Sequence, residues 1–166
     1  MDLKGRIKTI VVVVGIILLT ATAASSKTMK AAAKPAPDAE FKKLIAEYYK
    51  AWSSMNPNNA SKFYAKDAGL VFFDIAPLQY HGWDEYKAGV MKAFIEPSVS
   101  AVLAPNDDLV VNRRGTIAWT TVTFHLSAKA KAGGATEVDA RHTAIWEKRG
   151  GKWVIVHEHV SAPLPG

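Results

Sequence analysis

The stretch that decides the fold is 141–161, which reads Arg141-His-Thr-Ala-Ile-Trp-Glu-Lys-Arg-Gly-Gly-Lys-Trp-Val-Ile-Val-His-Glu-His-Val-Ser161. Two runs of strand-forming residues flank a glycine-containing turn, a pattern typical of a β-hairpin. Alternation along the second run places four side chains on one face: Trp153, Ile155, His157 and His159. Because this face mixes imidazoles with apolar side chains, we expect it to form the wall of a pocket.

The register of this hairpin decides which residues of its first strand face inward. If the loop holds an odd number of residues, Arg141 lies opposite His159 and Thr143 lies opposite His157, all facing inward. If the loop is even, His142 faces inward instead. A slip of one residue exchanges the two faces of a strand, so the sequence leaves both alternatives open. An inward arginine would indicate a ligand with a carboxylate or another anionic group.

The chain before this hairpin changes from helical to strand periodicity. Apolar residues at helical spacing predict a helix over 39–54 that begins after Asp38, a short helix over 60–64 and a helix over 83–95. Strands are predicted over 70–74, 98–104, 109–112, 116–127, 137–147 and 153–161, and 77–82 is predicted to be a loop. The order α-α-β-α-β-β-β-β predicts an α+β domain in which a curved antiparallel sheet wraps around the first helix.

The first 37 residues differ from the rest of the chain. An apolar run over 10–19 follows three basic residues, and Ala21-Thr22-Ala23 offers a small-residue cleavage site, which is the pattern of a secretory signal peptide over 1–23. The run is short for a membrane span. Residues 24–37 are rich in Ala, Lys and Pro, and they predict a flexible tether before one domain over 38–166. We therefore expect export to the periplasm, without a stable membrane anchor once the signal is cleaved.

The net charge of +6 is concentrated outside the predicted domain. Six of the 21 Lys and Arg residues and one of the 15 Asp and Glu residues precede residue 38, which leaves 15 bases and 14 acids in the domain. Nucleic-acid binding needs a basic stripe on a folded surface, so we do not expect it. The absence of cysteine excludes disulfides and thiolate chemistry.

Three motifs resemble the SnoaL-like branch of the nuclear transport factor 2-like superfamily. They are Phe63-Tyr-Ala-Lys-Asp-Ala68, His81-Gly-Trp-Asp-Glu-Tyr86 and the stretch 146–161, which is also similar to the end of the calcium/calmodulin-dependent kinase II association domain. The resemblance covers 38–166 and implies a cystatin-like cone whose first helix and inner sheet face enclose a pocket, with the outer face often forming a dimer. This superfamily hosts isomerases, cyclases, hydrolases, dehydratases and binding modules, so the fold does not assign a reaction.

The candidate catalytic residues are Asp74, Tyr48 and His157. Asp74 shares a strand face with apolar side chains, and partial desolvation would raise its pKa and suit it to act as a general base. Similarity to ketosteroid isomerase places Asp74 near that family's proton-shuttling aspartate and Tyr48 near its oxyanion-donating tyrosine. Thr143 stands where that family has a second, carboxylic acid donor. The alternatives are an aspartate that caps the following loop and a tyrosine of the core.

The candidate ligand-binding residues are Arg141, His159, Trp119, Tyr80 and Thr143. His157 and His159 could together bind a ligand oxygen, or they could be two structural histidines. Two imidazoles also supply half of a zinc site, with a third ligand from His125, His142 or Asp74. Because no spacing demands that third ligand, we expect neither a metal nor a cofactor.

These observations predict an exported domain, forming a homodimer, that binds a small and largely apolar molecule with a polar or anionic group in the cone pocket. One alternative is a cofactor-independent isomerase, lyase or hydrolase that uses Asp74 as its general base. The other is a non-catalytic dimerisation module whose cone is filled by aromatic and leucine side chains.

Overall fold

The structure is a computed structural model that describes residues 38–75 and 77–164. The predicted signal peptide and tether lie outside these residues. Among the residues that are described, no helix has the length and apolar character needed to cross a membrane.

The first and third helices form where their spacing predicts them, and the short second helix begins three residues before its predicted start at residue 60. α1 (Ala39–Ser53) begins after Asp38, whose side chain accepts a hydrogen bond from the backbone N–H of Glu40. α2 (Pro57–Ala60) begins after Asn56 and continues as a 3₁₀ turn over Ser61–Phe63. α3 (Gly82–Val90) continues as a π-helical turn, η2 (Met91–Ile95), and the two together fill the predicted range 83–95. Such π-helical turns are frequent at functional sites.

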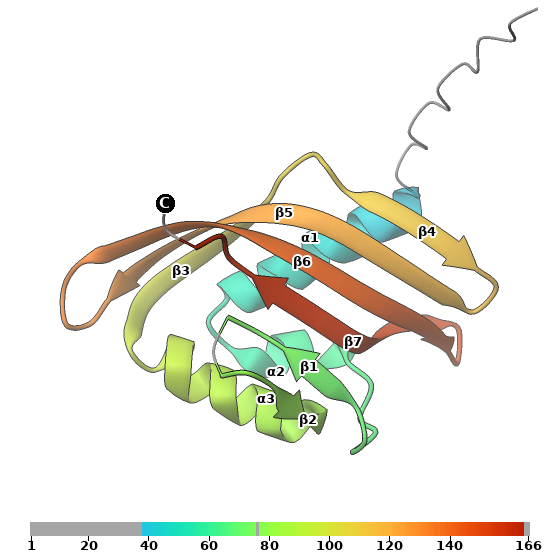
Figure 1. Cartoon of the computed structure of the whole chain (residues 1–166), viewed down its shortest axis with the longest axis horizontal. Coiled ribbons are helices and arrows are strands. Elements are labelled where there is room, and N and C mark those ends of the chain that lie inside the picture. Colours follow the sequence, from blue (N-terminus) through green and yellow to red (C-terminus); the bar gives the residue numbers. More distant parts are fainter. Residues whose placement is uncertain (1–37, 76, 165–166) are drawn as a thin grey trace, which may run out of the picture. The chain divides into compact units, whose positions relative to one another are not determined.

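The sheet holds seven strands among the described residues. They are β1 (Val71–Phe73), β2 (Tyr80–His81), β3 (Ser98–Pro105), β4 (Val110–Arg114), β5 (Ile117–Ala130), β6 (Ala135–Arg149) and β7 (Lys152–Ser161). The order is β2-β1-β7-β6-β5-β3, and β4 also pairs with β5. The long strands β5 and β6 curve over α1 (Figure 1). The predicted α+β class is therefore confirmed.

Two details of the sheet differ from the prediction. β1 runs parallel to β7, which makes the sheet mixed and not wholly antiparallel. No short hairpin turn joins β1 to β7, so these two strands are not constrained to run antiparallel. The predicted loop over 77–82 also contains the short strand β2, which pairs with β1.

A β-bulge in β7 decides which of its residues face inward. Trp146 pairs with Ile155, but the next pair joins Ile145 to His157, so Val156 is an extra residue without a partner on β6. Because one inserted residue exchanges the faces of a strand, the buried set is Trp153 and Ile155 before the bulge and Glu158 and Val160 after it. The bulge thus turns His157 and His159 to the outer face.

The hairpin loop between β6 and β7 is even, since Arg149 pairs with Lys152 across two glycines. The second of the two registers therefore applies. His142 is buried on the inner face, with 1% of its surface exposed, and Arg141 is exposed on the outer face.

Candidate functional site

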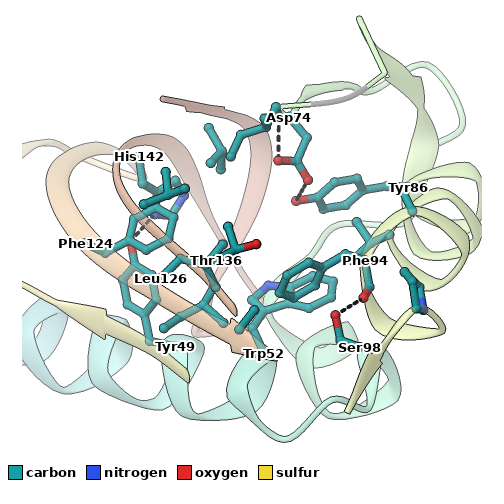
Figure 2. A pocket seen from close by; sticks show the side chains of 18 of the residues that line it. Tyr49, Trp52, Asp74, Tyr86, Phe94, Ser98, Phe124, Leu126, Thr136 and His142 are labelled. Atoms are coloured by element: carbon teal, nitrogen blue, oxygen red, sulfur yellow. Dashed lines mark hydrogen bonds between the residues drawn. The ribbon is translucent and has the colours of Figure 1, made fainter. Parts of the chain in front are cut away.

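A cavity of about 400 Å³ lies between α1, α3 with its π-helical turn, and the inner face of the sheet. Its wall is mostly apolar and aromatic, and it includes the side chains of Tyr48, Tyr49, Trp52, Asp74, Tyr80, Tyr86, Phe94, Phe124, Leu126 and His142. Asp74 and His142 are the ionisable groups on this wall apart from tyrosines, and no lysine or arginine is among the described residues that line it. Figure 2 shows Asp74 and Tyr86 on one side, and Tyr49, Phe124 and His142 on the other.

Three of the predicted site residues line this cavity, namely Asp74, Tyr48 and Tyr80. The others do not line it: Arg141, Thr143, His157, His159 and Trp119. Their expected place in the pocket was therefore wrong. The even loop turns Arg141 and Thr143 outward, and the bulge does the same to both histidines.

Two of these outward residues have other partners in the structure. The Nδ1 atom of His157 lies 2.8 Å from the backbone oxygen of Val71, where it can donate to β1. Trp119 lies between the buried residues Ala118 and Thr120, so it faces the other side of β5, where the guanidinium of Arg114 is 5.8 Å from its ring.

Asp74 follows the last residue of β1, where the chain passes the cavity. Its Oδ1 accepts a hydrogen bond of 2.7 Å from the backbone N–H of Ile75, and its Oδ2 lies 3.4 Å from the hydroxyl of Tyr86. Asp74 therefore caps its loop and lines the cavity at the same time. Burial raises the pKa of Asp74 from 3.8 to about 6, against the lowering effect of the Ile75 N–H, and the charge of Glu158 adds to the rise.

A fully buried carboxylate, that of Glu158, lies behind the wall of the cavity. Tyr86 donates to its Oε1 at 2.6 Å, and Tyr48 donates to its Oε2 at 2.8 Å. The hydroxyl of Tyr64 lies 3.0 Å and 3.1 Å from the two oxygens. Nε2 of His142 lies 3.2 Å from Oε2. Both oxygens are thus surrounded by donors, as a buried carboxylate requires.

These donors decide the charge of the Glu158 carboxyl. Burial by itself would raise the pKa of Glu158, but the hydrogen bond and charge of His142, together with the tyrosine hydroxyls, outweigh it and lower the pKa. Burial and the nearby carboxylates raise the pKa of Tyr48, Tyr64 and Tyr86 well above 10. The tyrosines therefore stay protonated and act as donors. The hydroxyl proton of Tyr48, which the resemblance to ketosteroid isomerase gives to a ligand oxygen, is donated to Glu158 here.

His142 connects this buried group to the cavity. Its Nδ1 lies 3.2 Å from the hydroxyl oxygen of Tyr49, and its ring stacks on Tyr48 with centroids 5.1 Å apart and planes inclined by 17°. His142 entered the sequence analysis only through the alternative hairpin register and as a possible third zinc ligand. The sequence contained a signal for Tyr86 as a site residue, because a tyrosine among the apolar residues of one helix face has to place its hydroxyl on a buried acceptor. The sequence contained no such signal for Glu158, since strand alternation placed it on the face opposite the predicted pocket wall.

The remaining histidine considered as a metal ligand lies elsewhere. His125 is on the outer part of the sheet, with Nδ1 2.8 Å from Asp139 and Nε2 2.7 Å from Glu137. Within 38–75 and 77–164, no group of three or more His, Asp or Glu side chains is arranged to hold a metal ion.

The family model of the SnoaL-like domain matches residues 42–165. The chain belongs to the SnoaL-like domain family. No curated protein matches the sequence of this SnoaL-like protein.

The fold of this SnoaL-like domain is similar to solved structures of the nuclear transport factor 2-like superfamily. A superfamily member from Salmonella enterica serovar Typhimurium LT2 is 18% identical with a TM-score of 0.69, and the match covers 76% of this chain and 90% of that one. A candidate dehydratase of the same family from Streptomyces avermitilis is 15% identical with a TM-score of 0.65, over 75% and 94%. A candidate calcium/calmodulin-dependent kinase II association domain from Xanthomonas campestris is 22% identical with a TM-score of 0.61, over 75% and 86%. At these identities the likeness shows a shared fold.

Proposed function

We propose that this protein binds a small, largely apolar molecule with an uncharged polar group, and that Asp74 acts on it as a general base without a cofactor. The observation that carries the proposal is a carboxyl with a raised pKa on the wall of a mostly apolar cavity. Known small-molecule sites have this character, with a few polar groups in an apolar wall and volumes of about 300–1,000 Å³. The cavity, at about 400 Å³, falls in that range, which favours a ligand over a filled dimerisation module.

The charges around the cavity support an uncharged ligand over an anionic one. With Arg141 on the outer face, His142 is the one group on the described wall that can carry a positive charge, and it is already paired with Glu158. An anion entering the cavity would lose its hydration beside Asp74 without gaining an arginine or lysine partner. We therefore keep the predicted apolar ligand with a polar group and drop the arginine-held carboxylate.

The state of Asp74 supports proton transfer. A general base works best when its pKa lies near the working pH, because it is then ionised and still basic enough to take a proton. A pKa of about 6 meets this condition for Asp74 at neutral pH, whereas an ordinary aspartate is a weaker base. Reactions that begin by removing a proton, including isomerisations and eliminations, are the class that this arrangement serves.

The experiment is a screen for exchange of carbon-bound hydrogen in heavy water, read by mass spectrometry on a panel of small ketones, enones and hydroxy ketones. The variant Asp74→Asn keeps the size of the side chain and removes the base. We expect exchange to fall by about 10²–10⁴-fold. Ligand binding, followed as protection against thermal unfolding, should be retained, because most of the wall is unchanged.

Arg141→Ala is the control variant in the same screen. Since Arg141 lies on the outer face, we expect neither exchange nor binding to change. Exchange that survives in Asp74→Asn would contradict the catalytic role. Binding without any exchange in the wild type would leave a binding protein, and the absence of binding across the panel would refute the ligand-binding proposal itself.

We also infer that the domain is exported and forms a homodimer through the outer face of its sheet. The signal-peptide pattern of 1–23 supports export to the periplasm. The exposed side chains of Ile117 and Ile145 on adjacent strands support an interface. Sedimentation of the wild type beside Ile145→Lys tests the dimer, which the charge should dissociate. The N-terminal residue of protein recovered from the periplasm tests cleavage after Ala23.

A further inference from the structure

A hydroxyl, an imidazole and a carboxylate form a continuous chain that ends at the cavity. Tyr49 and His142 both line the cavity, and Glu158 lies behind them. The hydroxyl of Tyr49 is 3.2 Å from Nδ1 of His142, and Nε2 of the same ring is 3.2 Å from Glu158. Figure 2 shows Tyr49 and His142 joined on the side of the cavity away from Asp74.

The partners of the His142 ring determine where its protons lie. Nε2 faces a carboxylate oxygen, which only accepts hydrogen bonds when ionised, so Nε2 carries a hydrogen. Nδ1 faces a hydroxyl, which can either donate or accept. When Nδ1 lacks a proton, Tyr49 donates to it and turns an oxygen lone pair to the cavity. When Nδ1 carries a proton, it donates to Tyr49, and the hydroxyl proton becomes available to a ligand.

Contacts at one face and at the ring nitrogens hold the His142 ring in place. Tyr48 stacks on one face of it, and Glu158 is itself fixed by the hydroxyls of Tyr48, Tyr64 and Tyr86. The charged and titratable groups that act on His142 are therefore Glu158 on β7, Tyr48 and Tyr49 on α1, and Asp74 after β1. An imidazole between a fixed carboxylate and a hydroxyl is the arrangement by which enzymes move protons through a weakly acidic hydroxyl.

We propose that Tyr49 is a second catalytic residue of this pocket, exchanging a proton with an oxygen atom of the ligand, and that Glu158 positions His142 to supply it. The inference rests on the proposed function, since it requires a ligand acted on by Asp74. It also defines that ligand further, as a molecule whose oxygen, a carbonyl or a leaving hydroxyl, lies on the Tyr49 side of the cavity.

The proton balance of the step is complete without another reactant. The C–H bond of the ligand breaks, and its proton forms an O–H bond on Asp74. The O–H bond of Tyr49 breaks as its proton bonds to the ligand oxygen, and the Nδ1 proton of His142 replaces it on Tyr49. His142 ends neutral with Nε2–H still directed at Glu158. Burial raises the pKa of Tyr49 far above 10, so the hydroxyl passes its proton on only as it receives another.

The test uses 4-nitrophenol as a probe, because its oxygen can be neutral or anionic and the anion absorbs visible light. The pKa of the bound phenol is measured in the wild type and in Tyr49→Phe, which removes one hydroxyl and keeps the ring. We expect the bound phenol to be about 10- to 100-fold easier to ionise in the wild type, which is a pKa lower by about one to two units. Neutral phenol should bind both proteins equally.

Two histidine variants form a matched pair for the same assay. In His142→Gln, the pKa of the bound phenol should no longer be lowered, as in Tyr49→Phe. In His159→Gln, whose substitution lies on the outer face, the pKa of the bound phenol should stay as low as in the wild type. A Tyr49→Phe protein that ionises the phenol as the wild type does would overturn the relay while leaving ligand binding intact.

A second measurement needs no ligand. Nitrogen NMR of the histidine rings, with His142 assigned from its absence in His142→Gln, reports which ring nitrogen carries a hydrogen. We expect Nε2 of His142 to carry a hydrogen, because it faces the Glu158 carboxylate at 3.2 Å. Absence of the Nε2 hydrogen in the folded protein would overturn the relay whether or not 4-nitrophenol binds. If 4-nitrophenol does not bind, the proposed ligand class fails as well.

Discussion

The environment of Asp74 makes a prediction about stability that can be tested without a substrate. Folding moves this carboxyl from water to the wall of an apolar cavity and raises its pKa from 3.8 to about 6. Between about pH 4 and pH 6, the folded state therefore binds more protons at this site than the unfolded state does. Stability falls as the pH rises through such a window, and the loss is complete above pH 6.

The size of the effect follows from the two pKa values. Each pKa unit corresponds to about 1.4 kcal/mol, so a fully realised change would cost about 3 kcal/mol at pH 8. Asp74 is partly exposed, and solvent screening reduces this figure, so we expect about 1–3 kcal/mol. Asp74→Asn removes the charge and keeps an oxygen that can accept the Ile75 N–H. The variant should be more stable than the wild type by this amount at pH 8 and equally stable at pH 4.

The assay is urea unfolding of both proteins at pH 4, 6 and 8, with the difference in unfolding free energy plotted against pH. Asp107→Asn is the matched control, because the Asp107 side chain is 94% exposed and should change stability by less than about 0.5 kcal/mol at every pH. If the difference between Asp74→Asn and the wild type is flat with pH, or if the variant is the less stable protein at pH 8, then the carboxyl is not desolvated in the folded protein.

Two further predictions concern the buried Glu158 and the bulge that places it. Glu158→Gln should lower the unfolding free energy by about 3–5 kcal/mol at pH 7 in urea unfolding, because an amide cannot accept hydrogen bonds from all of the tyrosine and histidine donors around Glu158. Glu47→Gln, on the surface of α1, is the control and should cost less than about 0.5 kcal/mol in the same assay. Because the pKa of Glu158 is lowered, the wild type loses this advantage as the pH falls below about 4, and an unchanged gap at pH 3 would argue against an ionised carboxylate. Deleting Val156 removes the bulge and exchanges the two faces of the rest of β7, so we expect the cooperative unfolding transition to be lost. Deleting Leu164, which is 91% exposed, is the control and should preserve the transition. A deletion of Val156 that unfolds like the wild type would refute the assigned role of the bulge.

Local patterns predicted most of the elements because the interactions that form them are local. The spacing of Phe41, Ile45, Tyr48 and Trp52 defined α1, and these residues are buried as their common face requires. The same logic found α3 and the long strands to within a few residues. Asp74 was also predicted correctly as a cavity residue, since its strand has apolar neighbours on the same face.

The candidate site was predicted less well because it depends on pairing between strands. A hairpin loop one residue longer would have placed Arg141 inside, and a β7 without its extra residue would have kept His159 inside. Neither distinction has a signal in the alternation of β7, because Val154, Val156 and Val160 fit either face equally. The contacts of Glu158 also come from α1, α3 and β6, which lie far from it in the chain.

The sequence by itself determined the α+β class, the positions of the helices and strands, the resemblance to the SnoaL-like family and the candidacy of Asp74, because periodicity and turn residues act over a few neighbouring positions. Only the tertiary structure decided that His142 and Glu158 face the core while Arg141, His157 and His159 do not. The physical reason is that a strand has two equivalent faces, and the choice between them is made by partners on other strands, here through one even turn and one bulge.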